Sequence, residues 1–275
     1  MKYLVSLLAI ALLFNCSKSD NDSEEEQFCG VFEGNIFLPS DDAIREFGKC
    51  NYTEITGDLS IGESSYAFTI TDLSPLSSIT KVGGALQLSS LRELNSLNGL
   101  HNIESASRLH IAYAVALENL DDLDKLQSSY IELSNNYALK NIDGLDMESD
   151  TIGTIGFFDC PSLINLNAFL NIKTAGYLGI KGCDSLTSLQ GLNSLETING
   201  GLSIRDNFYL ESLDELSNLT YLKGDIFIRD NPYLRYFCGL KTLFLADGHI
   251  DGDFEVGNNF NNPTQTMIMN APACD

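Results

Sequence analysis

The sequence predicts an all-β solenoid built from about eight leucine-rich repeats. Three observations support this prediction. A pair of apolar residues separated by one position recurs at a nearly constant interval, apolar residues then follow at about every third position, and a small residue or cysteine usually stands three places after the pair. Because self-similarity at a fixed period is the signature of repeat architectures, this pattern determines the fold class before any local element is assigned.

The repeats define a common unit with a three-residue beat. In the repeat that begins at Leu202, for example, apolar residues recur at Leu210, Leu213, Leu216 and Leu219. An amphipathic helix would place them at i, i+3, i+4 and i+7 instead. The beat therefore favours short extended segments around a filled core, with parallel strands of successive repeats stacked at about 4.8 Å. Within the chain, the repeats begin at Leu59, Leu86, Leu109, Ile131, Ile155, Leu178, Leu202 and Ile226.

The first interval is longer than the others, and residues 62–68 are interpreted as an insertion. A second recurrent feature is a column of residues at the corner after each strand. We expect these side chains to turn inward and to hydrogen-bond backbone groups that would otherwise be buried without partners. Two of them, Cys160 and Cys183, lie in adjacent repeats, where a disulfide or two reduced thiols would fit, and we favour reduced thiols. The predicted corner ladder consists of Asn136, Cys160, Cys183, Asn207 and Asn231.

Segments 134–145 and 229–240, "SNNYALKNIDGL" and "RDNPYLRYFCGL", resemble the receptor L domain. This is the leucine-rich right-handed β-helix of the insulin and epidermal growth factor receptor ectodomains, also found in fungal cell-wall proteins. The lead-in, residues 31–61, is similar to that of bacterial surface lipoproteins with such repeats. The resemblance covers roughly residues 57–245 and implies a right-handed β-helix with a recognition surface. The cysteine-rich modules and transmembrane helix of the receptors are missing, so kinase signalling is not implied.

The N-terminus predicts a lipoprotein signal peptide over residues 1–16. A positive Lys2 precedes an apolar run that is too short to span a bilayer, and the run ends in "LFNC", which resembles a bacterial lipobox with Cys16 as the lipidated residue. The acidic stretch that follows, residues 17–27, is predicted to be a flexible tether. It is similar to the export signal of surface lipoproteins in Bacteroidota. These features predict a lipid-anchored protein of the outer membrane or cell surface, facing the exterior or the periplasm; the alternative is an ordinary cleaved secretory peptide.

The repeat region, residues 57–245, needs a cap at each end. Residues 28–56 form the predicted N-terminal cap, with a short helix that starts after Ser40 and ends near Gly48. Residues 246–275 form the C-terminal cap, with a last irregular strand over residues 249–259. An oxidising compartment permits disulfides, and the pairs predicted to fasten the two ends are Cys29 with Cys50 and Cys238 with Cys274.

Several classes of function are disfavoured by composition and motif. A formal net charge of −22 opposes nucleic-acid binding, which rewards clustered Lys and Arg. His101, His110 and His249 belong to no catalytic or metal signature, and each is expected to be a lone, solvated histidine. The alternating acids over residues 251–255 lack the other ligands of a calcium loop and fit the outward face of a strand. The sequence therefore predicts no cofactor and no metal.

An enzyme remains an alternative because parallel β-helices include polysaccharide lyases, which combine acidic residues with a basic Arg or Lys. Arg205 with Asp206, and Arg229 with Asp230, would be the candidates. They stand at equivalent places in successive repeats, however, as duplication produces without any catalytic role. The prediction is a protein that is not an enzyme.

The outward-facing columns of the strands predict a binding face. They place aromatic and basic side chains together on an acidic protein, a combination enriched at binding surfaces. Strand propensity alone would also place Tyr and Phe on a sheet. The predicted partner is an extracellular protein or glycan, with a structural envelope spacer as the alternative. The predicted face consists of Arg108, His110, Tyr130, Phe158, Tyr177, Lys181, Arg205, Phe227 and Arg229.

Overall fold

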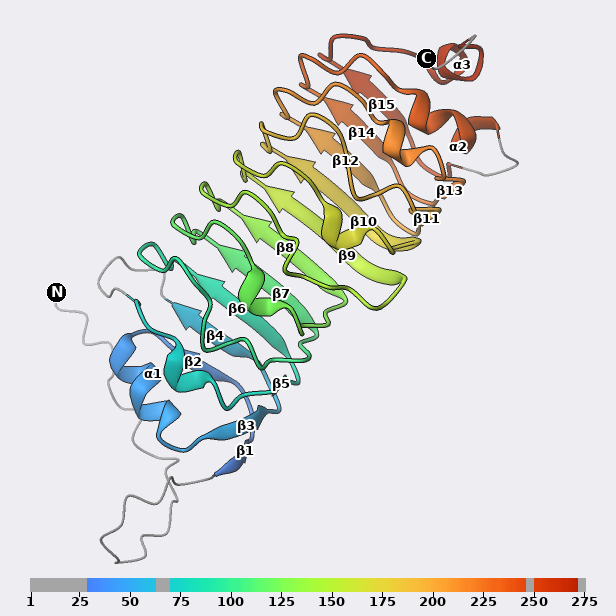
Figure 1. Ribbon diagram of the computed structural model, residues 1–275. Helices are drawn as coiled ribbons and strands as arrows, with labels where there is room; N and C mark the ends of the chain where they lie inside the picture. The colour runs from blue at the N-terminus through green and yellow to red at the C-terminus, as the bar shows by residue number, and fades with distance from the viewer. Residues whose placement is uncertain (1–28, 63–69, 246–249, 272–275) are drawn as a thin grey trace, which may run out of the picture.

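Parallel strands are stacked side by side from one end of the molecule to the other (Figure 1). The computed structural model describes residues 29–62, 70–245 and 250–271. Within these ranges the strands form one twelve-stranded sheet and one three-stranded sheet, accompanied by a few short helices. The protein is therefore mostly β, and its arrangement is consistent with the predicted solenoid.

The large sheet contains one strand from each repeat. In spatial order its strands are β15 (Phe254–Gly257), β14 (Ile226–Arg229), β12 (Leu202–Arg205), β10 (Thr174–Lys181), β9 (Thr151–Phe158), β8 (Tyr130–Ser134), β7 (Arg108–Ala112), β6 (Ala85–Ser89), β4 (Leu59–Gly62) and β2 (Ile36–Leu38). Two short strands, β11 (Thr197–Ile198) and β13 (Tyr221–Leu222), join it at β10. The smaller sheet has the order β1 (Gly30–Phe32), β3 (Tyr52–Ile55) and β5 (Lys81–Val82).

Strand register confirms the repeat that the sequence predicts. The first apolar residue of each repeat pairs directly with that of the next, through Leu59, Leu86, Leu109, Ile131, Ile155, Leu178, Leu202 and Ile226. The sheet also extends one strand further at each end, because Ile36 pairs with Leu59 and Phe254 pairs with Ile226. These two strands carry the same register into the segments that were predicted to be caps.

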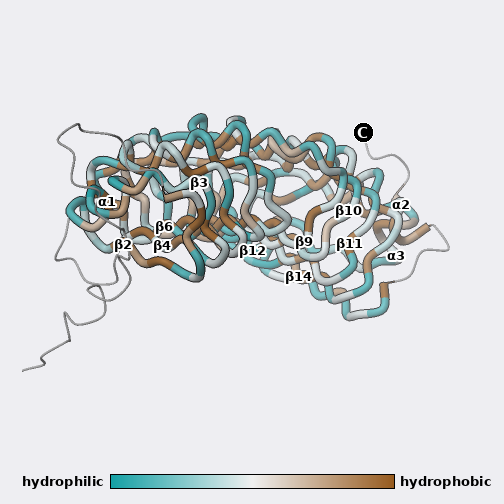
Figure 2. The backbone as a smooth tube through the Cα atoms, turned by 90° about the horizontal axis from the view of Figure 1, so that it is seen from below, coloured by the Kyte–Doolittle hydropathy of each residue, from teal (hydrophilic) through white to brown (hydrophobic). Residues whose placement is uncertain are grey.

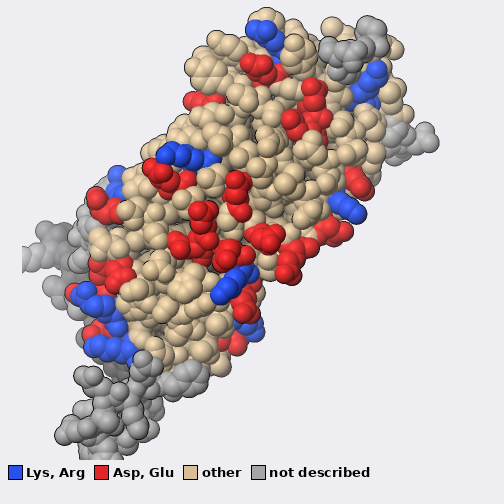
Figure 3. Space-filling model, in the orientation of Figure 1, with Lys and Arg blue, Asp and Glu red and all other residues tan. Residues whose placement is uncertain are grey.

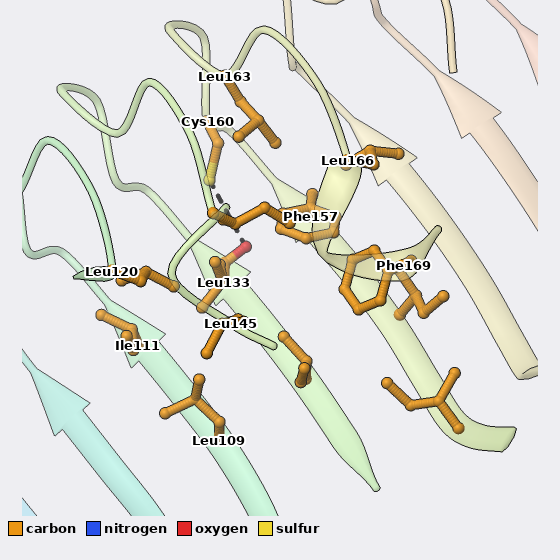
Figure 4. Close-up of a cluster of buried hydrophobic side chains, with 14 of the residues drawn as sticks. Leu109, Ile111, Leu120, Leu133, Leu145, Phe157, Cys160, Leu163, Leu166 and Phe169 are labelled. Carbon is orange, nitrogen blue, oxygen red and sulfur yellow. Dashed lines mark hydrogen bonds between the residues drawn. The ribbon is translucent and has the colours of Figure 1, made fainter. Parts of the chain in front are cut away.

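The core is a single stack of apolar side chains that runs from Leu38 to Ile268. Every apolar position of the three-residue beat in the Leu202 repeat is 0 % exposed. Figure 2 shows hydrophobic positions, in brown, recurring from one turn of the chain to the next, and Figure 4 shows the side chains meeting between repeats. Burial of each CH₂ contributes about 0.8 kcal/mol, but no repeat can bury its apolar face without a neighbour. The repeats therefore stabilise one another.

Short 3-10 turns occur between strands of successive repeats. They lie at Ser74–Leu76, Asp121–Leu123, Asn167–Phe169, Asp214–Leu216 and Cys238–Leu240. In each turn the last residue is a buried Leu or Phe that belongs to the core. The three-residue beat of the sequence thus arises partly from strands and partly from these tight turns.

A left-handed residue ends almost every strand of the large sheet. Asp206 has φ 57°, and its N–H donates to the carbonyl of Arg229 in the next repeat at 3.1 Å. Asn and Asp tolerate this conformation better than other residues with a Cβ, which explains the aspartate of the duplicated Arg-Asp-Asn. The same conformation occurs at Ser90, Tyr113, Asn135, Asp159, Gly182, Asp230 and Asn258.

The N-terminal helix α1 (Asp41–Gly48) forms where the sequence predicts it. The Ser40 hydroxyl accepts a hydrogen bond from the Ala43 N–H at 3.3 Å. The acidic residues in the first turn interact favourably with the positive end of the helix dipole. Ile44 and Phe47 are buried against the first repeats. At the other end, α2 (Lys241–Leu245) and α3 (Gln265–Met269) lie beside each other, and Ile268 joins the core.

Neither predicted disulfide is confirmed by the described residues. Cys238 is disulfide-bonded, whereas Cys274, its predicted partner, lies outside the described residues. At the N-terminal end, the Cys29 N–H donates to the carbonyl of Cys50 at 2.8 Å, so the two backbones are adjacent. The disulfide between these two residues stays a prediction.

The predicted N-terminal segments, 1–16 and 17–27, also lie outside the described residues, as do His249 and the insertion beyond Gly62. In the part of the chain that is described, no helix has the length and apolar character needed to cross a membrane.

Candidate binding face

The corner ladder is continuous from one repeat to the next. Asn207 accepts a hydrogen bond from the Cys183 N–H through Oδ1 at 3.0 Å and donates to the Ile180 carbonyl through Nδ2 at 3.1 Å. Its own N–H donates to Oδ1 of Asn231 at 3.0 Å. Asn231 repeats this pattern with Asn259, which the sequence interpretation did not include. Each side chain satisfies backbone groups of the repeat before it and so fixes where the strands of the face end.

Cys160 and Cys183 occupy the two rungs of this ladder that lack an asparagine. Both are free, buried thiols, and the Cys160 Sγ lies 3.7 Å from the Leu133 carbonyl (Figure 4). Burial raises the pKa of the Cys160 thiol to about 11 and raises that of Cys183 well above its usual value. The favoured interpretation of two reduced thiols therefore agrees with the structure.

The predicted face residues separate into two groups. Arg108, His110 and Tyr130 lie on β7 and β8, whereas the group on β10, β12 and β14 is closer to the C-terminus. Phe158, on β9, stands between them. The second group consists of Tyr177, Lys181, Arg205, Phe227 and Arg229. The face is thus one surface with two distinct clusters.

The side chains of the first cluster contact one another and Glu132. The Arg108 guanidinium lies over the Tyr130 ring at 4.0 Å, and the Tyr130 hydroxyl donates to Glu132 at 3.4 Å. The His110 Nε2 lies 3.7 Å from the other oxygen of Glu132. Tyr130, His110 and Glu132 are therefore mutual partners, whereas the exposed Arg108 contacts the Tyr130 ring.

The outward columns were expected to point the aromatic rings of the face into solvent, but these rings are only partly exposed. Tyr130, Phe158, Tyr177 and Phe227 are all half-buried. A Cβ built on Gly179 would lie 2.7 Å from the Tyr177 ring, and one built on Gly156 would lie 3.0 Å from the Phe158 ring. The Tyr177 and Phe158 rings therefore lie over Gly179 and Gly156, each of which is two positions away on the same strand. This correction follows from the side-chain sizes along the central column, which a propensity argument does not include.

A row of small residues crosses the middle of the face. Gly156, Gly179 and Ser203 are in register on adjacent strands, between Glu132 on one side and Phe227 on the other. Beside this row lies a hollow of about 550 Å³, which we call the Tyr177 hollow. It is lined by Tyr177, Gly201, Leu202, Ser203, Arg205, Gly224, Asp225, Phe227, Arg229 and Glu255.

The charged groups of the Tyr177 hollow are partly engaged. Arg229 forms an ion pair with Glu255 at 2.7 Å, and Asp225 accepts a hydrogen bond from the Asp253 N–H at 2.8 Å. Arg205 is exposed, and no ion pair joins it to another described residue. Arg205 is therefore the cation most available to a ligand in this hollow.

A larger hollow, of about 600 Å³, lies over the N-terminal strands and contains none of the predicted face residues. Its lining includes Phe37, Gln87, Arg92 and Tyr113. Phe37 is 53 % exposed at one rim.

Sequence reasoning missed a second set of aromatic residues. Phe208, Tyr209 and Tyr233 follow the corner asparagines and pack together with ring centroids 4.8–5.6 Å apart, yet each is exposed. We call this set the corner aromatics. The signal was present in "DNFYL" and "DNPYL", where aromatic residues occupy both places and one of the two places, respectively, between the inward Asn and the next inward Leu. Two consecutive positions between inward residues must point outward.

Expectations from the sequence also concern the described histidines and acids. His101 is half-buried and accepts a hydrogen bond from the Gly99 N–H at 3.2 Å, which corrects the expectation of a solvated side chain. Within the described ranges, no group of three or more His, Cys, Asp or Glu side chains is placed to hold a metal ion.

Acidic groups, in red, outnumber basic ones, in blue, on the face of the molecule seen in Figure 3.

No model of a protein family matches this chain, and no significant similarity to a curated protein was found. Functional inference therefore rests on the residues and the geometry of the chain itself.

Proposed function

We propose that this chain is a non-enzymatic, lipid-anchored surface protein that binds an extracellular protein or glycan through the outward face of its large sheet. The body is a right-handed β-helix resembling the receptor L domain, with Cys16 as the lipidated residue. In-register parallel strands and a continuous leucine core support the β-helix, and the lipobox-like N-terminus supports the anchor.

The observation that carries the binding proposal is the Tyr177 hollow. Two half-buried rings, Tyr177 and Phe227, flank a floor of small residues, and Arg205 stands exposed beside them. The Tyr177 ring already lies over Gly179, so it loses little conformational freedom on binding, and Arg and aromatic residues dominate binding energy at interfaces. The hollow therefore offers a preformed site.

The remaining charges of the hollow support binding rather than catalysis. Glu255 is paired with Arg229, and Asp225 holds a backbone N–H of the next repeat. Groups committed to structural contacts are poorly placed to move protons.

The test is a binding screen with the full-length protein against extracellular glycans and secreted proteins. Any ligand found is then measured against a double variant, Tyr177→Ala with Phe227→Ala, and a matched double variant at the corner aromatics, Tyr209→Ala with Tyr233→Ala. We expect the first pair to weaken binding and the second to leave it unchanged.

Loss of binding only in the Tyr209 and Tyr233 pair would move the site to the corner aromatics. Unchanged binding in both pairs would contradict a ligand site on either surface. It would favour the alternative, an envelope spacer, for which the elongated shape of the protein is suited.

A further inference from the structure

Three basic residues stand side by side on neighbouring strands of the face. Lys181 is in register with Arg205, and Arg205 is in register with Arg229. The chain has 16 Lys and Arg against 38 Asp and Glu, so a charged neighbour of any cation is expected to be acidic. Like charges directly opposite each other destabilise a sheet. This basic ladder therefore lowers stability, which indicates a role other than folding.

The basic ladder is only partly neutralised by the protein. Arg229 is paired with Glu255, whereas Lys181 and Arg205 form no ion pair with any described residue. Asp206 and Asp230 follow the two arginines along the chain, but both have a left-handed backbone conformation and neither forms an ion pair with a described residue. The Nε of Arg229 is buried and has no hydrogen-bond partner. Lys181 and Arg205 are therefore two adjacent cations that are available to an anion.

The Tyr177 hollow lies next to these cations and has a mixed chemistry. Arg205 lines it, and Lys181 stands beside Arg205 on the next strand. Asp225 and Glu255 also line the hollow; Oδ1 of Asp225 and Oε1 of Glu255 are engaged, and the second oxygen of each carboxylate can accept a hydrogen bond from a hydroxyl group. Tyr177 and Phe227 provide apolar ring surface. A suitable ligand combines one anionic group, several hydroxyl donors and a flat apolar face.

We propose that Lys181 and Arg205 bind the carboxylate or sulfate of an acidic saccharide whose ring occupies the Tyr177 hollow. This inference rests on the proposed function and specifies the ligand class for the same face. Arg presents a planar fork of donors to such an oxyanion, and charge-assisted hydrogen bonds of this kind are stronger than neutral ones. The sugar hydroxyls donate to Asp225 and Glu255, while its ring packs between Tyr177 and Phe227.

An acidic polypeptide is a poorer match for the same cations. The carboxylates of Asp225 and Glu255 line the hollow, and the protein as a whole carries a net charge of −22. A chain of aspartates and glutamates would be repelled by both, whereas a sugar brings neutral hydroxyl donors to the carboxylates.

The experiment measures binding of three probes to the full-length protein by calorimetry: an oligogalacturonate, a sulfated galactan oligosaccharide and an uncharged galactan oligosaccharide. At least one acidic probe should bind more tightly than the uncharged one, and comparison of the two acids shows whether carboxylate or sulfate is recognised. Arg205→Ala and Lys181→Ala should each weaken binding of that acid about tenfold and leave the uncharged probe unaffected. Lys223→Ala, which removes an exposed cation that does not line the hollow, is the matched control.

Two further measurements separate a ligand contact from a structural role. The preference for the acid should decline as NaCl is raised in the parent but not in the double variant Arg205→Ala with Lys181→Ala, because salt screens exposed charges. The melting temperature of Arg205→Ala should be no lower than that of the parent, because the substitution relieves repulsion within the ladder.

Equal binding of acidic and uncharged probes, or an acid preference that survives both substitutions, would overturn the acidic-saccharide inference. If another ligand then depended on Tyr177 and Phe227 but not on Arg205, the proposed function would stand without it. If no ligand responded to Tyr177 and Phe227, the proposed function itself would fail.

Discussion

Asn207 gives the most direct test of how the corner ladder stabilises the fold. Replacement by Ala removes an acceptor for the Cys183 N–H and a donor to the Ile180 carbonyl, at 3.0 and 3.1 Å. Both residues are at most 1 % exposed, so water cannot replace the lost partners without entering the core. Each buried backbone group left unpaired costs about 1–3 kcal/mol. Asn207→Ala is therefore expected to lower the free energy of unfolding by about 2–6 kcal/mol.

The assay is equilibrium urea unfolding together with hydrogen exchange of the native protein. Protection should fall at the amide of Cys183, which loses its acceptor, and in the strands on either side. Asn199→Ala is the matched control, because Asn199 is exposed and lies in the preceding turn of the chain. Substitutions of this kind usually change stability by no more than about 0.5 kcal/mol.

Two results would refute this reasoning. One is an Asn207→Ala variant whose stability matches that of Asn199→Ala. The other is a large loss of stability without any change in exchange at Cys183, because the cost would then arise elsewhere. Arg205→Ala provides a second comparison, since an exposed charge contributes weakly to folding.

Three other predictions concern the core, the thiols and the N-terminus. Leu189→Asp should unfold several repeats together, because it places an unpaired carboxylate in a site that is 0 % exposed at a cost of several kcal/mol; a melting curve equal to that of the exposed control Thr187→Asp would contradict it. Cys160 and Cys183 should resist iodoacetamide at pH 8 until urea is added, as followed by mass spectrometry, because the neutral thiol is unreactive. A pKa raised from 9.0 to about 11 in the folded state also predicts stability that is intact below pH 9 and declines as pH rises toward 11; rapid native alkylation would contradict both expectations. Cys16→Ala should abolish metabolic labelling with a fatty acid and release the protein from membranes, since the lipid contributes about 0.8 kcal/mol per buried CH₂; a variant that still takes up label would show that the anchor is elsewhere.

The repeat could be predicted in detail because its periodicity is a local property of the chain. The starts from Leu59 to Ile226 pair in the expected order, since a one-residue slip would turn every core residue outward. The extra strands β2 and β15 were assigned to caps, although they continue the same register. The interval from Ile226 to Phe254 is longer than the rest and includes α2, which obscures the period.

The outward face was predicted only in part. Its columns follow from strand alternation, but the orientation of each ring and the pairing of each charge depend on the residues packed beside them. Tyr177 lies down because position 179 is a glycine, and Arg229 is occupied because β15 brings Glu255 next to it. The glycine can be read from the sequence, whereas Glu255 is recognisable as a neighbour of Arg229 only when β14 and β15 are paired. The corner aromatics were overlooked for a different reason, since attention to the inward Asn left the two residues after it unassigned.

The sequence by itself determined the period, the strand faces and the inward corner column, because each is set by apolar spacing and by backbone groups that must find partners. Only the tertiary structure decided which charges remain unpaired and where the face is hollow. Lys181, Arg205 and Arg229 are separated by whole repeats along the chain, and stacking of strands makes them neighbours. Contact between side chains from different repeats is a property of the assembled sheet. For that reason the available pair of Lys181 and Arg205 beside the Tyr177 hollow emerges only when the repeats are packed together.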